Sequence, residues 1–151
     1  MLHKVVQLGG KSYFWLEKTN VVSMIQEYQV SGFRVREYEE LGSTNTEAER
    51  VGWSELEDKM VILTYRQTQG RGQVGNHWES EPGKNISMTV VFKPRELPAG
   101  QQFAVSMVIA LGACDFISRY VNECSVKWPN DIYVGDRKIS GILIEHSIMG
   151  R

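Results

Sequence analysis

The chain has 151 residues, of which 42% are hydrophobic and 23% are charged, and its formal net charge at pH 7 is −1. This composition is typical of a globular protein with one respectable core, either a single domain or a piece of a larger one. The near-neutral charge provides no overall basic field, which argues against a DNA-binding protein and against recruitment to acidic membranes.

The first 32 residues form a weakly patterned lead-in that is short for an independent domain. Within it we predict a short strand over residues 12–16 and a helix over residues 21–28. Apolar and charged side chains then alternate over residues 33–38, and this period of two predicts a half-buried strand.

Thr44 and Glu47 have the spacing of a capping box, which predicts a helix that begins there and covers Val51. Two β-favouring runs follow, over residues 60–65 and 85–92. The first is expected to be an interior strand that leads into a glycine-rich loop. The second is expected to end at the prolines that come after it.

The strongest helix pattern covers residues 101–121. Its apolar positions form a wide face made by Phe103, Val105, Met107, Val108, Leu111, Ala113, Phe116 and Ile117. The only two cysteines, Cys114 and Cys124, span the end of this helix in no CxxC arrangement, so we interpret them as reduced, packed thiols of a cytoplasmic protein. No segment has the pattern of a signal peptide or of a membrane-spanning helix.

Short strands are predicted over residues 125–128 and 132–134, and the turn at residues 135–137 predicts a hairpin into a strand over residues 138–145. Strands and helices thus alternate irregularly, which indicates an α/β or α+β fold with a mixed sheet. Since the chain stops soon after the apolar run at residues 142–144, we expect a truncated chain or one that completes its core with another chain.

Residues 70–75 have the sequence Gly-Arg-Gly-Gln-Val-Gly and match the dinucleotide-binding pattern GxGxxG. That pattern requires an amphipathic helix directly afterwards. Pro82 and Gly83 follow instead, without an apolar stripe, so a dinucleotide oxidoreductase is disfavoured. A solvent-exposed loop explains the glycines but not Arg71, whose fork of donors suits a carboxylate or a phosphate. We therefore interpret the loop as a site for an anion or a nucleotide.

Other polar segments allow alternative interpretations. For residues 43–45, helix capping is favoured over contacts to a polar ring. Lys127 and Lys138 bracket a Pro-Asn-Asp break and are expected to face one anionic site, held in place by Asp131, whereas solvated lysines on a hairpin are the alternative. His77 lies near acidic residues without a known metal-ligand spacing, so we predict a loop histidine in water and no protein metal site.

The motifs occur in the order Ser43-Thr44-Asn45, Gly70-Arg71-Gly72-Gln73-x-Gly75-Asn76-x-Trp78, Asn85, Lys127-Trp128-Pro129-Asn130-Asp131 and Lys138-x-x-Gly141-Ile142-Leu143-x-Glu145. In this order, over residues 43–145, they resemble the biotin protein ligase (biotin–[acetyl-CoA-carboxylase] ligase) family. The resemblance implies a mixed, largely antiparallel sheet flanked by helices, as in class II aminoacyl-tRNA synthetases and biotin ligases. It implies an enzyme that joins biotin to ATP, forming biotinyl-5′-AMP and pyrophosphate, and then passes the biotinyl group to a lysine of a biotin carboxyl carrier protein.

The resemblance also assigns roles to residues. The biotin-binding residues would be Ser43, Thr44, Asn45, Gln67, Gly70, Arg71, Gly72, Gln73, Lys138 and Gly141. The residues on the ATP side would be Asn76, Trp78, Lys127, Asn130 and Asp131. Arg71 and Lys138 would be the catalytic charges, because a carboxylate that attacks an anionic phosphorus needs fixed cations and Mg²⁺ to offset the repulsion. Asp131 is a candidate to orient or deprotonate the acceptor lysine.

The chain departs from the family pattern in places. Many members carry arginine where Gln73 stands, so one cationic contact to the adenylate is expected to be missing. In the family, the catalytic domain continues with a Gly- and Asn-rich strand and a small C-terminal β-barrel. We therefore expect residues 33–151 to be the N-terminal part of a catalytic domain, incomplete for activity, and residues 1–32 not to be a DNA-binding domain.

The expected partner is a carrier protein, with neither nucleic acid nor membrane, and a homodimer is compatible with the sequence. Lipoate–protein ligase is the nearest alternative, because it is a relative by fold and chemistry. A piece that binds biotin without catalysis, or that binds nothing, is the other alternative.

Overall fold

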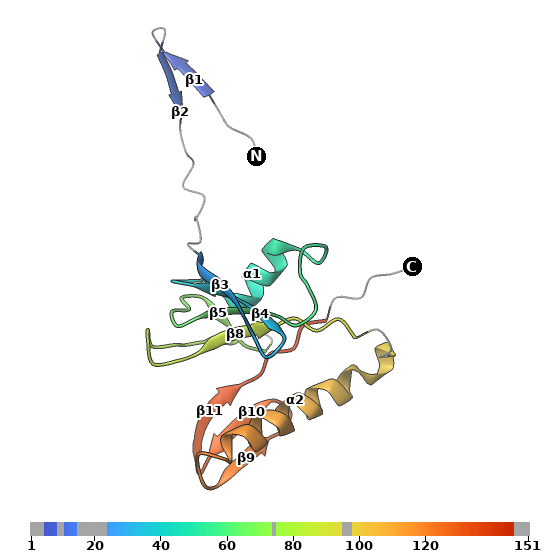
Figure 1. Ribbon diagram of the computed structural model, residues 1–151. Helices are drawn as coiled ribbons and strands as arrows, with labels where there is room; N and C mark the ends of the chain where they lie inside the picture. Colours follow the sequence, from blue (N-terminus) through green and yellow to red (C-terminus); the bar gives the residue numbers. More distant parts are fainter. Residues whose placement is uncertain (1–4, 9–10, 15–23, 74, 95–97, 147–151) are drawn as a thin grey trace.

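The computed structural model describes residues 5–8, 11–14, 24–73, 75–94 and 98–146. The main sheet has the spatial order β3-β4-β5-β8, with bounds β3 (Met24–Val30), β4 (Phe33–Tyr38), β5 (Met60–Thr64) and β8 (Ser87–Val90). β4 and β5 run parallel, and the other two pairs are antiparallel. Helix α1 (Thr44–Val51) packs against β5 and β8 (Figure 1). The expected mixed, largely antiparallel sheet is confirmed.

A second unit is made of a three-stranded antiparallel sheet and the longer helix (Figure 1). Its elements are η1 (Ala99–Gln101), α2 (Gln102–Ile117), β9 (Cys124–Lys127), β10 (Asp131–Val134) and β11 (Arg137–Gly141). β10 is the central strand, and α2 contacts β9 and β10. Neither α1 nor α2 is long and apolar enough to cross a membrane, and this holds for every helix among the described residues.

Two short hairpins add to these units. They are β1 (Val5–Leu8) with β2 (Lys11–Phe14), and β6 (Gly70–Arg71) with β7 (His77–Trp78). The predicted strand over residues 12–16 overlaps β2, and its last two positions lie outside the described residues.

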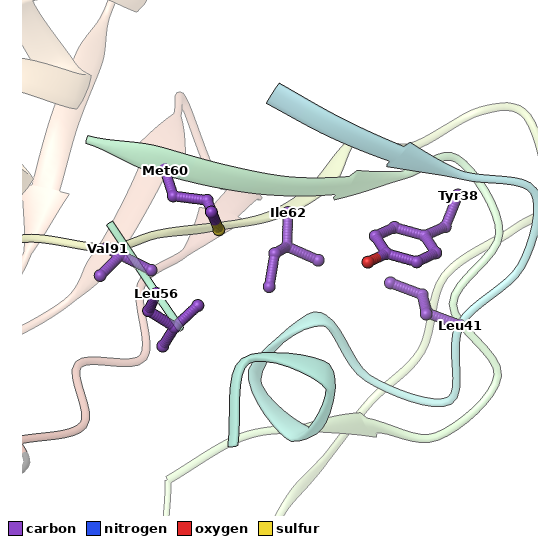
Figure 2. Packing of buried hydrophobic residues seen from close by; sticks show 6 residues of the cluster. All are labelled: Tyr38, Leu41, Leu56, Met60, Ile62 and Val91. Atoms are coloured by element: carbon purple, nitrogen blue, oxygen red, sulfur yellow. The ribbon is translucent and has the colours of Figure 1, made fainter. Parts of the chain in front are cut away.

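The core lies between β5 and α1. Met60 and Ile62 are fully buried on β5, and they form a cluster with Tyr38, Leu41, Leu56 and Val91 (Figure 2). The alternate positions of β5, Val61 and Leu63, form a second buried cluster with Val35. Since every residue of β5 is buried, the prediction of an interior strand over this run is confirmed.

The helix predicted over residues 21–28 is wrong where the structure describes it, because residues 24–28 belong to β3. Ser31 and Gly32 have φ angles of 49° and 81°, so they form a tight turn that returns the chain antiparallel to β4. Positive φ at both central residues is the geometry that pairs adjacent strands in a hairpin. The backbone of this segment is therefore paired with β4 instead of closing helical turns.

The strand predicted over residues 138–145 is too long, because β11 ends at Gly141. Beyond it, the N–H of Ile142 donates to the carbonyl of Asn130 at 2.9 Å, and the Asn130 side chain donates to the carbonyl of Ile142 at 2.8 Å. The backbone bond continues the antiparallel register of β10 and β11 by one position, and the described residues after Gly141 belong to no strand. The hairpin that precedes β11 is confirmed.

The long helix is confirmed over Gln102–Ile117 and ends four residues earlier than predicted. Its apolar face is mostly not in the core of the described residues. Phe103, Val108 and Leu111 are 51%, 68% and 62% exposed, whereas Ala110 is 2% exposed. Apolar residues occur on all sides of α2. One side of the helix therefore covers β9 and β10, and another side exposes apolar side chains.

Candidate active site

The start of α1 presents the Ser43-Thr44-Asn45 motif. Ser43 has an extended backbone (φ −153°, ψ 137°), and its hydroxyl accepts a hydrogen bond from the N–H of Thr46 at 3.4 Å. Ser43 is therefore the N-cap, and the capping-box prediction that placed the cap at Thr44 is wrong by one residue. Thr44 is the first helical residue, so its hydroxyl is available for contacts outside the helix.

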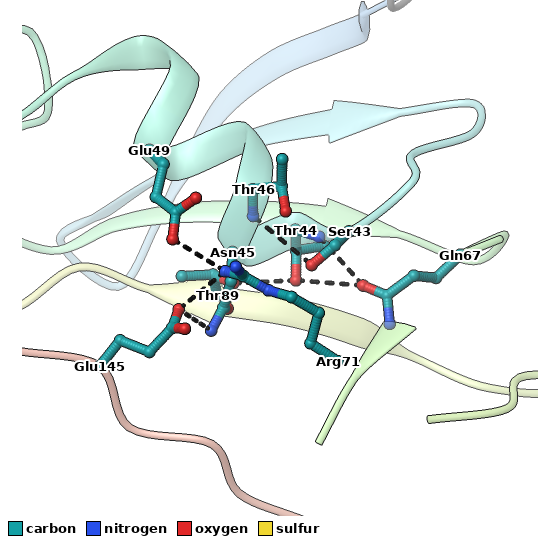
Figure 3. A network of polar contacts seen from close by, with 9 residues as sticks. All are labelled: Ser43, Thr44, Asn45, Thr46, Glu49, Gln67, Arg71, Thr89 and Glu145. Carbon is teal, nitrogen blue, oxygen red and sulfur yellow. Dashed lines mark hydrogen bonds and ion pairs between the residues drawn. The ribbon is translucent and has the colours of Figure 1, made fainter. Parts of the chain in front are cut away.

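A chain of polar contacts joins this motif to β8 and to the segment after β5 (Figure 3). Thr44 donates from its N–H to Oε1 of Gln67 at 3.0 Å. Thr89 Oγ1 lies 2.8 Å from the hydroxyl of Thr44 and also donates to Oδ1 of Asn45. Because Thr44 is buried and Thr89 is half-buried, these groups are shielded from water and ordered by one another.

Arg71 lies at the other end of this series of polar contacts. Its Nη2 donates to Oε1 of Glu49 at 2.9 Å and to Oε2 of Glu145 at 3.0 Å. Asn45 donates to the same Glu145 oxygen at 2.8 Å (Figure 3). The hydrogen bond to Glu49 is the main cause that raises the pKa of Arg71 above its ordinary value. Burial, the next largest effect, lowers this pKa, and the charges of Glu145 and Glu49 raise it. Arg71 is thus a fixed cation.

The glycine loop forms the β6–β7 hairpin, in which Gly70 pairs with Trp78. Within it, the N–H of Gly72 donates to the carbonyl of Asn76 at 2.8 Å. A Cβ at Gly70 would lie 2.4 Å from the carbonyl oxygen of Trp78, so no larger side chain fits there without a backbone shift. The loop leads into a strand and not into a helix, which confirms that GxGxxG is not a dinucleotide-binding turn here.

Lys138 comes from β11 and lies beside the hairpin. Its Nζ is 2.7 Å from Oδ1 of Asp131 and 5.0 Å from the centre of the Trp78 ring. A Cβ at Gly141 would lie 2.7 Å from the same ring, so the glycine makes room for Trp78. The expected placement of Lys138 against Asp131 is confirmed.

Lys127 faces a different partner. In the sheet register, Lys127 of β9 lies opposite Asp131 of β10, and Lys138 of β11 lies opposite Tyr133 of β10. Asp131 and Tyr133 are two residues apart on one strand, so both lysines lie on the same face of this sheet. Lys127 Nζ is 3.5 Å from the hydroxyl of Tyr133 and 5.3 Å from the centre of its ring. Asn130 is bound to the backbone of Ile142, as described above. The structure therefore gathers Lys138, but not Lys127, around Trp78.

An open cleft of about 420 Å³ adjoins the β6–β7 hairpin. It is lined by residues 66–70, 77–80 and 82. Of the predicted site residues, Gln67, Gly70 and Trp78 line this cleft, whereas Thr44, Asn45, Arg71 and Lys138 lie outside its lining.

The site geometry can be compared with known proteins. A family model described as Biotin/lipoate A/B protein ligase family matches residues 38–151. The chain belongs to this family.

Curated relatives include the bifunctional ligase/repressor BirA of Escherichia coli, which is 31% identical over 144 residues, covering 93% of this chain and 44% of the relative. The biotin–[acetyl-CoA-carboxylase] ligase of Paracoccus denitrificans is 32% identical over 110 residues, covering 72% of this chain and 45% of the relative. The chain therefore spans less than half the length of these relatives.

A solved structure gives the fold of the family. The biotin acetyl coenzyme A carboxylase synthetase of Helicobacter pylori, with bound biotinylated ATP, superposes with a TM-score of 0.58 at 28% sequence identity. The similarity covers 75% of this chain and 55% of that one. The biotin ligase-like fold expected from the sequence is confirmed.

Three residues of this ligase-family site were missed by sequence reasoning, namely Thr89, Glu49 and Glu145. Thr89 lies on β8 opposite Ile62 of β5, and the other inward-facing residue of β8, Ser87, is also polar, so the strand pattern does not single out Thr89. Glu145 belongs to the quoted motif but received no role. Glu49 carries no signal, because a helical glutamate is ordinarily solvated.

No group of three or more potential metal ligands among His, Cys, Asp and Glu occurs in the part of the chain that the structure describes. His77 is exposed on β7.

Proposed function

We propose that the chain is part of a biotin protein ligase, which activates biotin with ATP to biotinyl-5′-AMP and transfers biotin to a lysine of a biotin carboxyl carrier protein. The observation that carries this proposal is that the Ser43-Thr44-Asn45 motif and Arg71 of the glycine loop, which are far apart in the sequence, meet in one polar network. The names of the curated relatives and the ligand of the Helicobacter pylori structure support biotin over lipoate.

In this proposal, the start of α1 holds the biotin ring. A ureido ring offers N–H donors and a carbonyl acceptor, and it needs complementary groups that are already ordered. Ser43, Thr44, Asn45 and Gln67 supply hydroxyls and amides that the network orders. Gly70, Gly72, Gln73 and Gly141 would complete the biotin side.

Activation joins two anions. An oxygen of the biotin carboxylate attacks the α-phosphorus of ATP, and the bond to the pyrophosphate oxygen breaks. Arg71 and Lys138 are the proposed catalytic charges, because fixed cations offset the repulsion and stabilise the charge that develops. Arg71 contacts Glu49 and Glu145 through Nη2, so Nε and Nη1 have N–H groups for a ligand. Positioning of the two reactants supplies further acceleration.

The nucleotide side is proposed to comprise Asn76, Trp78, Lys127, Asn130 and Asp131. Trp78 and Lys138 already stack on one another, which supports a shared boundary between the biotin and nucleotide parts. Mg²⁺ would neutralise phosphate charge. Since Mg²⁺ in nucleotide sites is held largely by phosphate oxygens and water, it requires no cluster of protein ligands, and the described residues contain none.

For the transfer step, the amine of the acceptor lysine attacks the biotinyl carbonyl and AMP leaves. Asp131 is proposed to orient or deprotonate that amine, in addition to holding Lys138. An Asp131→Asn enzyme is expected to transfer biotin more slowly from preformed adenylate. Unchanged transfer would contradict this role, and slower adenylate formation alone would assign Asp131 to the first step.

We also propose that residues 33–151 are the N-terminal part of the catalytic domain and that residues 1–32 are a lead-in without DNA-binding function. β3 pairs with β4, so the described end of the lead-in already belongs to the main sheet, which supports its structural use. The protein is proposed to act in the cytoplasm on a carrier protein, without nucleic acid or membrane as partners. A homodimer is compatible with this proposal, and a measurement of the mass in solution tests it.

The test is pyrophosphate release from ATP with biotin, with lipoate or with no acid. We expect biotin-dependent release by a full-length protein that contains this chain, and weak or no release by the 151-residue chain alone. Lipoate-dependent release would contradict the biotin assignment. Robust release by the chain alone would show that these residues suffice.

Arg71→Gln tests the catalytic charge in the full-length protein. Removing one donor to a developing anion typically costs about 100-fold or more in rate, and we expect a loss of that order in adenylate formation. Arg34→Gln is the matched control, because Arg34 lies on β4, outside the proposed site, and also forms ion pairs with two glutamates, Glu27 and Glu57. Equal losses in both variants would contradict a specific role for Arg71.

A further inference from the structure

The two cysteines of the chain lie side by side in the second unit. Cys114 is in the last turn of α2 and Cys124 is the first residue of β9, and their Sγ atoms are 3.3 Å apart. Both thiols are free and half-buried. The sequence predicted packed thiols, and the proposed ligase function uses neither of them.

The backbone holds both cysteines in place. The carbonyl of Cys114 accepts a hydrogen bond from the N–H of Ser118 at 2.9 Å, and Cys124 pairs with Val134 of β10. Between them the chain turns back through Glu123, whose φ is 59°. A disulfide has an S–S length near 2.05 Å, so the sulfurs need to approach by only about 1.2 Å from their 3.3 Å separation.

We propose that Cys114 and Cys124 form a modification site, an intrachain disulfide that forms with a small-molecule disulfide such as oxidised glutathione as the oxidant. The thiolate of one cysteine attacks a sulfur of the oxidant, whose S–S bond breaks and releases one thiol. The second cysteine then attacks the protein sulfur of this mixed disulfide, which forms the Cys114–Cys124 bond and releases the second thiol. Two electrons and two protons pass from the protein to the oxidant.

The surroundings of the pair allow this exchange. Every residue from Ser118 to Glu123 is exposed, so a small oxidant reaches the thiols from this side. The hydrogen bond with Cys124 is the main cause that raises the pKa of the Cys114 thiol, and burial and the charge of Asp115 raise it further, against a contact with Ser118 that lowers it. The raised pKa lowers the thiolate fraction of Cys114, which slows its attack on an oxidant but does not prevent the exchange.

The bond would fasten α2 to the small sheet. α2 contacts β9 and β10, and β9 ends at Lys127, directly before the Trp-Pro-Asn-Asp motif. Fixing the first residue of β9 to the helix restricts the motion of this unit relative to α2. The disulfide thus acts on the framework of the second unit and leaves the network around Arg71 untouched.

The experiment equilibrates the full 151-residue chain with mixtures of reduced and oxidised glutathione, traps free thiols by alkylation and measures intact mass. Since the chain has only two cysteines, an intrachain disulfide has to join this pair and appears as the loss of two hydrogens without alkylation. The same titration in denaturant gives the effective thiol concentration of the unfolded chain. We expect a value at least about tenfold higher for the folded chain, which corresponds to about 1.4 kcal/mol of added stability.

Equal effective concentrations in the folded and unfolded chain would overturn the proposal, because chain proximity alone would then explain the bond. Retention of two alkylated thiols, or products that are only mixed disulfides or disulfide-linked dimers, would also overturn it. Cys114→Ser and Cys124→Ser are the controls. With one thiol each, they are expected to give only one alkylated thiol, a mixed disulfide or a disulfide-linked dimer. In the oxidised native chain the midpoint of thermal unfolding is expected to rise by several degrees, and neither serine variant should show this rise.

Discussion

Gly70 is the residue at which the glycine loop tolerates least change. A Cβ there would meet the carbonyl oxygen of Trp78 at 2.4 Å, a distance that only a shift of the backbone can relieve. We expect Gly70→Ala to separate β6 from β7, to lower the free energy of unfolding by about 1–3 kcal/mol and to weaken biotin binding by the full-length protein. Thermal unfolding and calorimetric titration with biotin measure these effects.

Gly112→Ala is the matched control, because a Cβ at Gly112 meets no atom within 4 Å and the residue lies inside α2. Alanine is the better helix former, so this variant is expected to gain about 0.5–1 kcal/mol and to leave biotin affinity unchanged. A Gly70→Ala protein with normal biotin affinity would show that the loop does not need its observed backbone path.

Thr89 connects the start of α1 with β8 through one hydroxyl. Thr89→Val removes that hydroxyl at nearly constant volume, so the Thr44 hydroxyl and Oδ1 of Asn45 each lose one hydrogen-bond partner. We expect biotin affinity to fall by roughly tenfold or more, since a half-buried polar group that loses its partner costs about 1–3 kcal/mol. Thr89→Ser retains the hydroxyl and is expected to restore most of the affinity. If Thr89→Ser is as weak as Thr89→Val, the methyl group and not the hydroxyl is responsible.

Strand β4 carries Tyr38, whose ring is buried in the core beneath α1 (Figure 2). Burial is the largest cause that raises the pKa of Tyr38 above 10.0, the charge of Glu47 adds to it, and Arg36 and Arg50 oppose it. The unfolded chain therefore loses this proton at a lower pH than the folded chain. Above about pH 10 the unfolded state binds fewer protons, so the free energy of unfolding falls as the pH rises.

Tyr38→Phe is expected to lessen this alkaline loss, which denaturant unfolding at pH 8 to 11 would measure as a flatter dependence on pH. Tyr120→Phe is the control, because Tyr120 is 73% exposed. An alkaline loss that stays equally steep in Tyr38→Phe would assign it to other groups.

The elements differ in how far the sequence could predict them. β4 and β5 were predicted closely, since a period of two and a compact apolar run are local signals. β3 was predicted as a helix, because its assignment depends on the Ser31-Gly32 turn and on pairing with β4. The burial of α2 was not predictable either, because local apolarity says nothing about which side another element covers.

The site shows the same division. From the residues alone, helix capping was favoured for residues 43–45, and their binding role came only from the family resemblance. Arg71 was interpreted as an anion-binding residue because it stands between glycines soon after a buried strand. Glu49 and Thr89 could not be assigned roles, since their contacts with Arg71 and Asn45 join positions far apart in the chain. Such contacts follow from how β8 and α1 pack, and the local pattern of neither segment contains this information.

For the whole molecule, Glu145 is one of the residues that join the two units, as Lys138 does beside Trp78. Glu145 follows β11 of the second unit and accepts hydrogen bonds from Asn45 and Arg71 of the first (Figure 3). Its side chain is 44% exposed and that of Arg71 is 37% exposed, so the ion pair is screened by water. Exposed pairs of this kind contribute about 0–1 kcal/mol to folding. Glu145 therefore matters because it fixes the positions of Asn45 and Arg71, and not because it stabilises the fold.

We expect Glu145→Ala to change the free energy of unfolding by less than about 1 kcal/mol, while amide hydrogen exchange accelerates in β6 and β7, because Arg71 then keeps only its contact with Glu49. Glu81→Ala is the matched control, since Glu81 forms an ion pair with Lys84 and is 71% exposed. If exchange accelerates equally in both variants, or throughout the main sheet, Glu145 is not a specific link. Acceleration confined to the hairpin would mean that the second unit sets the position of Arg71 through a single carboxylate.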